Sequence, residues 1–135
     1  MQKLKAAYIC VHNSCRSQMA EAITRELASD AIQCWSGGTE IKDHIDKGAV
    51  NIIKKFYGVD MEQLQYPKLL ADIPEVDIVI TMGCNVTCPS LPAAAHADWG
   101  LDDPTGGTEK EYERIAKIIE EKVMDLREAA LNRAE

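Results

Sequence analysis

The chain passes from a strand pattern to a helix pattern through Cys10-Val11-His12-Asn13-Ser14-Cys15-Arg16-Ser17. Before this stretch, residues 6–11 (AAYICV) form a short, continuous apolar run, which is typical of a buried strand in a parallel sheet. After it, apolar side chains recur at helical spacing from Met19 to Leu27, and Ser17 stands where it can cap the first helical turn. The stretch is therefore predicted to be a loop between a strand and a helix.

Further strand and helix patterns alternate along the chain. Residues 32–36, 76–81 and 93–98 are predicted strands, and residues 46–57 and 108–132 are predicted amphipathic helices. This alternation predicts an α/β fold, a flavodoxin-like three-layer sandwich in which helices flank a four-stranded parallel sheet of order 2-1-3-4. Ligands bind such sheets at the carboxyl ends of strands 1 and 3, so Cys10 and Cys84 are expected to face one crevice.

The composition is that of a folded globular protein with a single domain, residues 1–135. Of its 135 residues, 46% are apolar and 27% are charged, and the formal net charge is -7. An acidic chain does not suit non-specific nucleic-acid binding, which needs clustered Lys and Arg. An anionic substrate must be attracted by local groups, because the overall charge repels it.

The five cysteines belong to a chain that we expect to be cytoplasmic. It has no run of about 20 apolar residues that could span a membrane, and no signal-peptide pattern precedes the first strand. Structural disulfides are rare in the cytoplasm, so the cysteines indicate nucleophilic, redox or metal chemistry, except for Cys34, which is expected to be a small buried side chain. The five are Cys10, Cys15, Cys34, Cys84 and Cys88.

The loop of residues 10–17 has the features of a site for a tetrahedral oxyanion. Backbone N–H groups that turn inward before a helix form an anion-binding nest, and the helix N-terminus adds partial positive charge. Arg16 can hold two oxygens of the anion, and Asn13 can adopt the left-handed backbone conformation that such a turn needs. The same positive field favours the thiolate of Cys10, which suits attack on phosphorus or arsenic. A chance Cys-X5-Arg pattern does not explain the position between strand and helix.

This loop resembles that of the low-molecular-weight protein tyrosine phosphatase superfamily. Residues 13–21 (NSCRSQMAE) are similar to its thioredoxin-coupled arsenate reductase branch, and the resemblance runs from Tyr8 through the last helix. It implies the same fold, a catalytic Cys10 and Arg16, and binding of the anion by the whole loop. Within the loop, Cys15 is expected to pack and His12 to face the solvent. The substrate-binding residues are then Val11, His12, Asn13, Ser14, Cys15, Arg16 and Ser17.

The resemblance also implies a general acid. Asp102-Asp103-Pro104 follows the fourth strand, and in the family the aspartate before the proline protonates the departing oxygen, a role that falls to Asp103. Taken alone, the three residues would be an ordinary turn. Tyrosine phosphatases of the family carry aromatic residues after the Asp-Pro pair, whereas this chain has Thr-Gly-Gly at 105–107 and so lacks the expected clamp for an aryl phosphate.

Two further cysteines distinguish a reductase from a phosphatase. Cys84 and Cys88 are four positions apart, which in a helical turn places their Cα atoms about 6 Å apart, within reach of a disulfide. The resemblance implies a catalytic relay in which Cys84 attacks Cys10, Cys88 attacks Cys84, and thioredoxin reduces the resulting disulfide. Glutaredoxin or glutathione is a less favoured reductant. A zinc site at Cys84 and Cys88 would need further ligands that the nearby sequence lacks.

No bound cofactor is expected, apart from a potassium ion that some members of the branch hold near the loop. Asn13, Glu21 and Ser36 match family ligand positions for that ion. The fourth ligand, an aspartate, is missing, because Gln65 and its neighbours occupy the region where it is expected. Glu21 can instead serve only as a hydrogen-bonding partner of the loop.

The sequence thus predicts an arsenate reductase of arsenic detoxification that binds arsenate, phosphate or sulfate, with no nucleic-acid or membrane partner. A low-molecular-weight phosphatase acting on phosphotyrosine or small phosphoesters is the main alternative, and a weak phosphatase side activity is expected in either case. A sensor that binds arsenite without turnover is a third hypothesis. It is disfavoured because a sensor needs neither Arg16 nor Asp103.

Overall fold

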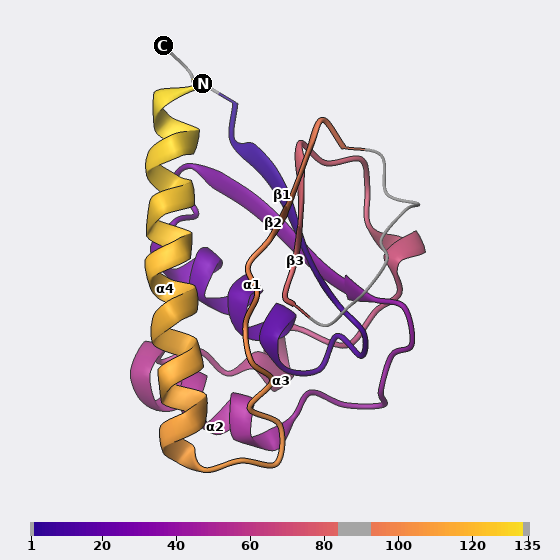
Figure 1. The fold of residues 1–135 in the computed structure, drawn as a ribbon, viewed down its shortest axis with the longest axis vertical. Helices are drawn as coiled ribbons and strands as arrows, with labels where there is room; N and C mark the ends of the chain where they lie inside the picture. The colour runs from indigo at the N-terminus through magenta and orange to yellow at the C-terminus, as the bar shows by residue number, and fades with distance from the viewer. Residues whose placement is uncertain (1, 84–92, 134–135) are drawn as a thin grey trace.

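The computed structural model describes residues 2–83 and 93–133 (Figure 1). Its sheet has four parallel strands and its long C-terminal helix runs along one side of the molecule (Figure 1). In chain order the elements are β1 (Leu4–Cys10), α1 (Arg16–Leu27), β2 (Ile32–Gly38), α2 (Lys47–Tyr57), α3 (Met61–Leu64), the 3-10 turn η1 (Leu70–Asp72), β3 (Ile78–Thr81), β4 (Ala95–Asp98) and α4 (Glu109–Asn132).

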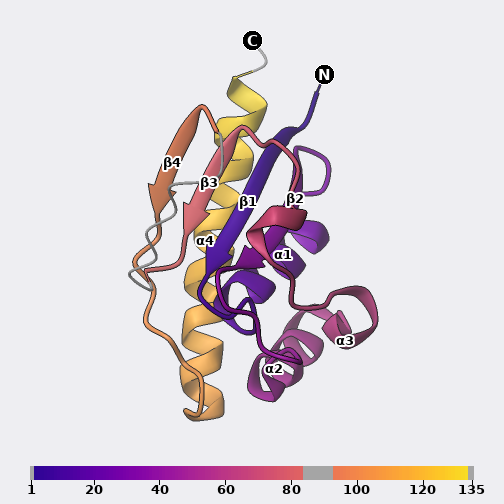
Figure 2. The same ribbon diagram turned by 90° about the vertical axis from the view of Figure 1, so that its right-hand side faces the viewer.

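The strand order is β2-β1-β3-β4, and every pair is parallel, which confirms the predicted topology (Figure 2). In the register of the central strands, Cys10 is opposite Gly38 of β2, and Ile9 is opposite Thr81 of β3. The carboxyl ends of three strands therefore meet at one edge of the sheet, where β1 gives way to the loop that begins at Cys10.

The two faces of the sheet are covered by different segments. Helices α1 and α4 pack on one face, with α2 against them, and the turn around η1 lies over the other (Figure 2). The side chains of β1 alternate between these layers: Ala6 and Tyr8 join the larger core, whereas Ala7 and Ile9 join the smaller one. A strand buried on both faces reads as a continuous apolar run, which is why residues 6–11 show no alternation of polar and apolar residues.

The two helices that begin at the site differ in their capping. Asp46 caps α2 by accepting a hydrogen bond from the Ala49 N–H (3.3 Å), and Gly58 ends the helix in the left-handed conformation, with a φ of 70°. The prediction that Ser17 caps the first helix was wrong. Helix α1 begins at Arg16 without a side-chain cap, because the Ser17 hydroxyl is bonded to side chains of the loop instead.

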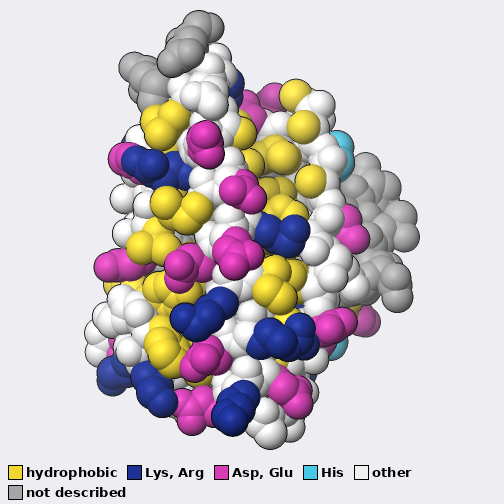
Figure 3. All heavy atoms as spheres, turned by 60° about the vertical axis from the view of Figure 1, so that its left-hand side comes forward, with side chains coloured by type: hydrophobic (Ala, Val, Ile, Leu, Met, Phe, Trp, Pro, Cys, Tyr) yellow, Lys and Arg dark blue, Asp and Glu magenta, His cyan; other side chains and the backbone are white. Residues whose placement is uncertain are grey.

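On the face that α4 presents, Lys and Arg side chains lie among Asp and Glu side chains (Figure 3). The coloured side chains of this view therefore form no broad basic stripe of the kind that nucleic acid needs. Within the described ranges, none of the helices combines the length and the hydropathy of a membrane span.

Candidate active site

The loop between β1 and α1 is held in place through its carbonyl groups. The Val11 carbonyl accepts the amides of Thr39 and Glu40 (both 2.9 Å), and the Ser14 carbonyl accepts the Asp46 amide (2.8 Å). Within residues 2–83 and 93–133, by contrast, no acceptor takes the amide N–H groups of residues 12–15. Backbone amides without protein acceptors, gathered just before a helix, are what an anion-binding nest requires.

Two backbone positions allow the loop to fold this tightly. Asn13 has a φ of 49° and is completely buried, so the predicted left-handed conformation is present. Gly38 lies against the outside of the loop, where a Cβ atom would come within 2.5 Å of the Val11 carbonyl oxygen. Sequence reasoning missed this role, and the only signal for it was the Gly-Gly pair at the end of the second strand.

The loop encloses a cavity of about 190 Å³ at the predicted edge of the sheet. Cys10 borders this cavity and is only 5% exposed, so the cavity gives access to an otherwise buried residue. Thr105 and Lys42, neither of which belonged to a recognised motif, complete the wall. The lining residues are Cys10, Val11, His12, Ser14, Cys15, Arg16, Lys42, Asp103 and Thr105.

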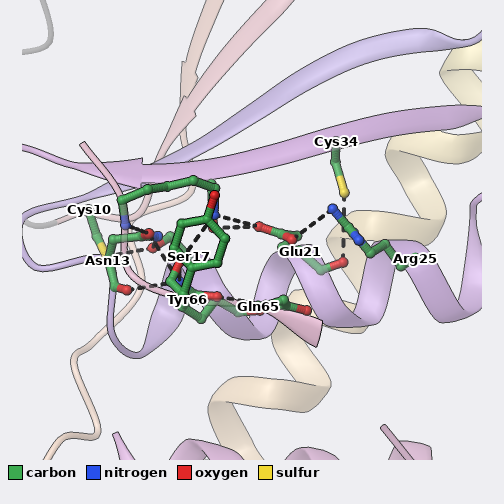
Figure 4. Close-up of polar contacts among 11 residues, drawn as sticks. Cys10, Asn13, Ser17, Glu21, Arg25, Cys34, Gln65 and Tyr66 are labelled. Carbon is green, nitrogen blue, oxygen red and sulfur yellow. Dashed lines mark hydrogen bonds and ion pairs between the residues drawn. The ribbon is translucent and has the colours of Figure 1, made fainter. Parts of the chain in front are cut away.

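The Cys10 sulfur lies 2.8 Å from the hydroxyl oxygen of Ser17 (Figure 4). The Asn13 side-chain amide donates to the same oxygen (2.9 Å). When Cys10 is a thiolate it has no proton to donate, so the Ser17 hydroxyl is then the donor to the sulfur. A hydroxyl that donates to sulfur stabilises the thiolate, which is the nucleophilic form.

Arg16 is 7% exposed, and backbone carbonyls fix its guanidinium group. One nitrogen, Nη1, donates to the carbonyls of Met82 (3.0 Å) and Leu101 (2.7 Å), which follow β3 and β4. The other, Nη2, lies 3.7 Å from a carboxylate oxygen of Asp103. The guanidinium is thus oriented by two strand ends before any anion binds.

Asp103, the predicted acid, stands on the rim of the cavity with a half-exposed side chain. Its Oδ1 accepts hydrogen bonds from the amide (3.0 Å) and the hydroxyl (2.6 Å) of Thr105. Burial raises the pKa of Asp103, but these hydrogen bonds and the charges of Arg16 and Lys42 outweigh that effect and lower the pKa below its ordinary value. The carboxyl group is therefore ionised at neutral pH in the free protein.

The other described cysteines are buried thiols. Cys15 and Cys34 are 4% and 6% exposed, and burial raises the pKa of each to about 12. The packing role predicted for both agrees with these surroundings, although Cys15 also borders the cavity. Cys84 and Cys88 lie outside the described residues. Gly83, just before them, has a φ of 86° and touches the backbone of residues 100–101, so the close approach requires glycine there.

The expected potassium ligands do not fit a bound cation. Glu21, whose side chain is 2% exposed, accepts a hydrogen bond from Ser36 (2.6 Å) and lies 3.0 Å from Arg25 and 3.5 Å from Lys68 (Figure 4). The Asn13 side-chain oxygen already accepts two N–H groups, from Gln18 and from the Lys68 backbone. Two cationic side chains thus face one carboxylate, so a further cation would be repelled. Elsewhere in the described ranges, no three His, Cys, Asp or Glu side chains could hold a metal ion together.

A model of the low-molecular-weight phosphotyrosine protein phosphatase family matches residues 5–135. The chain belongs to this family. It is 33% identical over 125 residues to an arsenate reductase of Staphylococcus epidermidis, covering 88% of this chain and 92% of the relative. Among solved structures, an arsenate reductase in its phosphate-binding state is 27% identical with a TM-score of 0.85, covering 94% of this chain and 98% of that one. A thioredoxin-dependent arsenate reductase of Corynebacterium glutamicum is 25% identical with a TM-score of 0.76, covering 97% and 63% respectively.

Proposed function

We propose that this protein reduces arsenate to arsenite, with Cys10 as the nucleophile. The observation that carries the proposal is the cavity itself, which places the Cys10 sulfur, hydrogen-bonded to the Ser17 hydroxyl, beside the amides of residues 12–15 and the fixed guanidinium of Arg16. Such a cavity suits any tetrahedral oxyanion, arsenate and phosphate included. The similarity to proteins named arsenate reductase favours arsenate.

In the first step, the Cys10 thiolate attacks arsenic and an arsenic–oxygen bond breaks. The departing oxygen leaves as water and needs a proton, which we assign to Asp103. In the free protein Asp103 is ionised. A bound oxyanion neutralises Arg16 and adds negative charge next to the carboxylate, so binding raises the pKa of Asp103 and allows the acid to take up its proton.

The electrons for the reduction come from two thiols. Cys84 attacks the sulfur of Cys10, a disulfide forms, and the electron pair of the sulfur–arsenic bond stays on arsenic, which leaves as arsenite. Cys88 then attacks Cys84, which forms the Cys84–Cys88 disulfide and returns Cys10 as a thiolate. An external dithiol, which we propose to be thioredoxin, reduces that disulfide. The thioredoxin dependence named for the Corynebacterium relative supports this choice.

A weak phosphatase activity through the same cysteine is part of the proposal. The cavity would hold a phosphoester as it holds arsenate, and the family model is named for phosphatases. Thr105 and the two glycines after it supply no aromatic surface for a phosphotyrosine ring, so we expect this activity to be minor. The cytoplasmic location remains a prediction.

The test follows NADPH oxidation with arsenate, thioredoxin and thioredoxin reductase. Wild-type protein should turn over steadily, whereas Cys10→Ser, Cys84→Ser and Cys88→Ser should each lose arsenate-dependent turnover. Turnover with glutathione and glutaredoxin alone would keep the reductase and change its partner. Hydrolysis of aryl phosphates that survives Cys84→Ser and Cys88→Ser, with no reduction of arsenate by any donor, would identify a phosphatase instead.

A further inference from the structure

One tyrosine joins the loop that carries Asp103 to the loop that carries Cys10. Tyr112 lies in the first turns of α4 and is 4% exposed. Its hydroxyl donates to the Asp46 carboxylate (2.5 Å) and accepts the N–H of Gly106 (3.1 Å). The hydroxyl therefore connects the acid loop with the N-terminus of α2, and neither contact belongs to the usual bonding within a helix.

Asp46 extends this connection to the anion loop, the loop of residues 10–17 between β1 and α1. Its side chain caps α2, and its backbone N–H donates to the Ser14 carbonyl (2.8 Å), one of the bonds that hold the loop in place. At the other end, Gly106 follows Thr105, whose amide and hydroxyl both bind the Asp103 carboxylate. Hydrogen bonds, linked through the backbone of residues 105–106 and through Asp46 itself, thus connect the acid with the wall of the anion site.

The ring of Tyr112 can hold this place because α2 leaves room for it. At Gly48 a Cβ atom would come within 2.2 Å of the ring, so no larger residue fits there with the ring in position. Burial raises the pKa of Tyr112, and its hydrogen bond to Asp46 raises it further. The phenol therefore keeps its proton at physiological pH and always donates to Asp46, which leaves its oxygen to accept from Gly106.

We propose that Tyr112 is a positioning residue, which sets the height of Asp103 over a bound oxyanion by tying the acid loop to α2. The inference rests on the proposed function, because Asp103 acts as an acid only if an oxygen leaves the substrate. It assigns Tyr112 to the proton-transfer step and not to anion binding, since Tyr112 is not among the cavity-lining residues.

A plain structural role would be the alternative, in which the hydroxyl only fastens α4 to α2. The chain offers a matched control for that role. The Tyr57 hydroxyl, at the other end of α2, donates to Glu120 of α4 (2.6 Å) and likewise joins the two helices through a tyrosine and a carboxylate. Its bond leads to no residue of the acid loop, so Tyr57→Phe removes a similar contact without disturbing Asp103.

The experiment is a single turnover of fully reduced protein mixed with arsenate, in which released arsenite is counted and no external donor is needed. For Tyr112→Phe we expect the maximal rate to fall about tenfold, while the half-saturating arsenate concentration stays within about twofold of wild type. Asp103→Asn should lose about a hundredfold or more. The double variant should be no slower than Asp103→Asn alone, because Tyr112 acts through Asp103. Tyr57→Phe should match the wild type.

Hydrogen exchange at the Gly106 amide gives a second measurement that does not depend on turnover. It should be faster in Tyr112→Phe than in wild type or Tyr57→Phe. A Tyr112→Phe variant with the wild-type rate, a double variant about tenfold below Asp103→Asn, or unchanged exchange at Gly106 would each overturn the inference. Wild-type protein that releases no arsenite would overturn the proposed function, and exchange at Gly106 would then still decide whether Tyr112 holds the loop.

Discussion

Replacing Lys68 by methionine should destabilise the protein and create a need for potassium. The lysine side chain is 12% exposed and its ammonium lies 3.5 Å from the buried carboxylate of Glu21. Methionine keeps the length and the apolar stem of the side chain but removes the charge. The Lys68 backbone N–H would still donate to the Asn13 side chain (2.9 Å), so the change removes the ion pair and an exposed hydrogen bond from the ammonium to the Tyr66 carbonyl (3.3 Å) but leaves the loop bonded.

The size of the effect follows from the surroundings of Glu21. Two unit charges 3.5 Å apart attract each other by about 5 kcal/mol at an effective dielectric constant of about 20. Removing one partner of a buried pair costs about 3–5 kcal/mol when nothing else compensates the charge that remains. Arg25 and Ser36 still contact Glu21, so we expect a loss of about 2–3 kcal/mol in the free energy of unfolding.

Urea unfolding in potassium chloride and in sodium chloride of equal concentration measures both effects. The wild type should be equally stable in the two salts, because its carboxylate already faces two cations. The Lys68→Met variant should regain about 1.4 kcal/mol when potassium exceeds its dissociation constant tenfold. The control is Lys47→Met, which breaks a solvent-exposed pair with Glu62 (2.6 Å) and should cost no more than about 1 kcal/mol.

Two results would refute this reasoning. If potassium stabilised the wild type as much as the variant, Arg25 and Lys68 would not be what keeps a potassium ion away from Glu21. If Lys68→Met cost no more than Lys47→Met, the charge of Lys68 would contribute nothing to the burial of Glu21.

Three further predictions concern the site and the core. Arg16→Lys should weaken phosphate binding tenfold to a hundredfold, because a lysine cannot bind both the Leu101 carbonyl and the anion. This loss corresponds to roughly 1.5–3 kcal/mol for one charge-assisted hydrogen bond, and calorimetry measures it. Burial raises the pKa of Cys34 to about 12 in the folded protein, whereas an unfolded chain loses this proton at about pH 8.5, so the free energy of unfolding should fall as the pH rises above about 9. In urea titrations, Cys34→Ala should make this fall shallower by up to about 1.4 kcal/mol per pH unit. Phosphate binding near pH 6 should take up a proton in wild type and not in Asp103→Asn, measured calorimetrically in buffers of different ionisation enthalpy.

The sequence predicted the strand order because each layer of the fold leaves a local trace. The apolar run of residues 6–11 marks a strand covered on both faces, and the period of the last helix marks the stripe that packs on the sheet. The loop could be predicted for the same reason, since Cys10, Asn13 and Arg16 lie close together in the chain and act in one turn.

Contacts between distant segments left no such trace. Ser17 stands where a capping residue belongs, but Cys10 and Asn13 offer its hydroxyl better partners, and only the folded loop brings them together. Lys68 reaches Glu21 across 47 positions, and Tyr112 reaches Asp46 across 66. Nothing in the local sequence distinguishes either residue from its neighbours, so sequence reasoning considered a potassium ion or a hydrogen bond to the loop for Glu21 and identified no role in the site for Tyr112.

On the proposed mechanism, the charges around the cavity explain how an acidic protein binds an anion and delivers a proton to it. Arg16 and Lys42 supply the positive potential that a net charge of -7 would otherwise deny to the substrate. The same two cations help to keep Asp103 ionised, and therefore unable to act as an acid, while the cavity holds no anion. Once an oxyanion neutralises them, they no longer lower the pKa of Asp103, and the carboxylate can take up a proton. Binding and protonation are then one coupled event, so the acid is ready only when there is an oxygen to protonate.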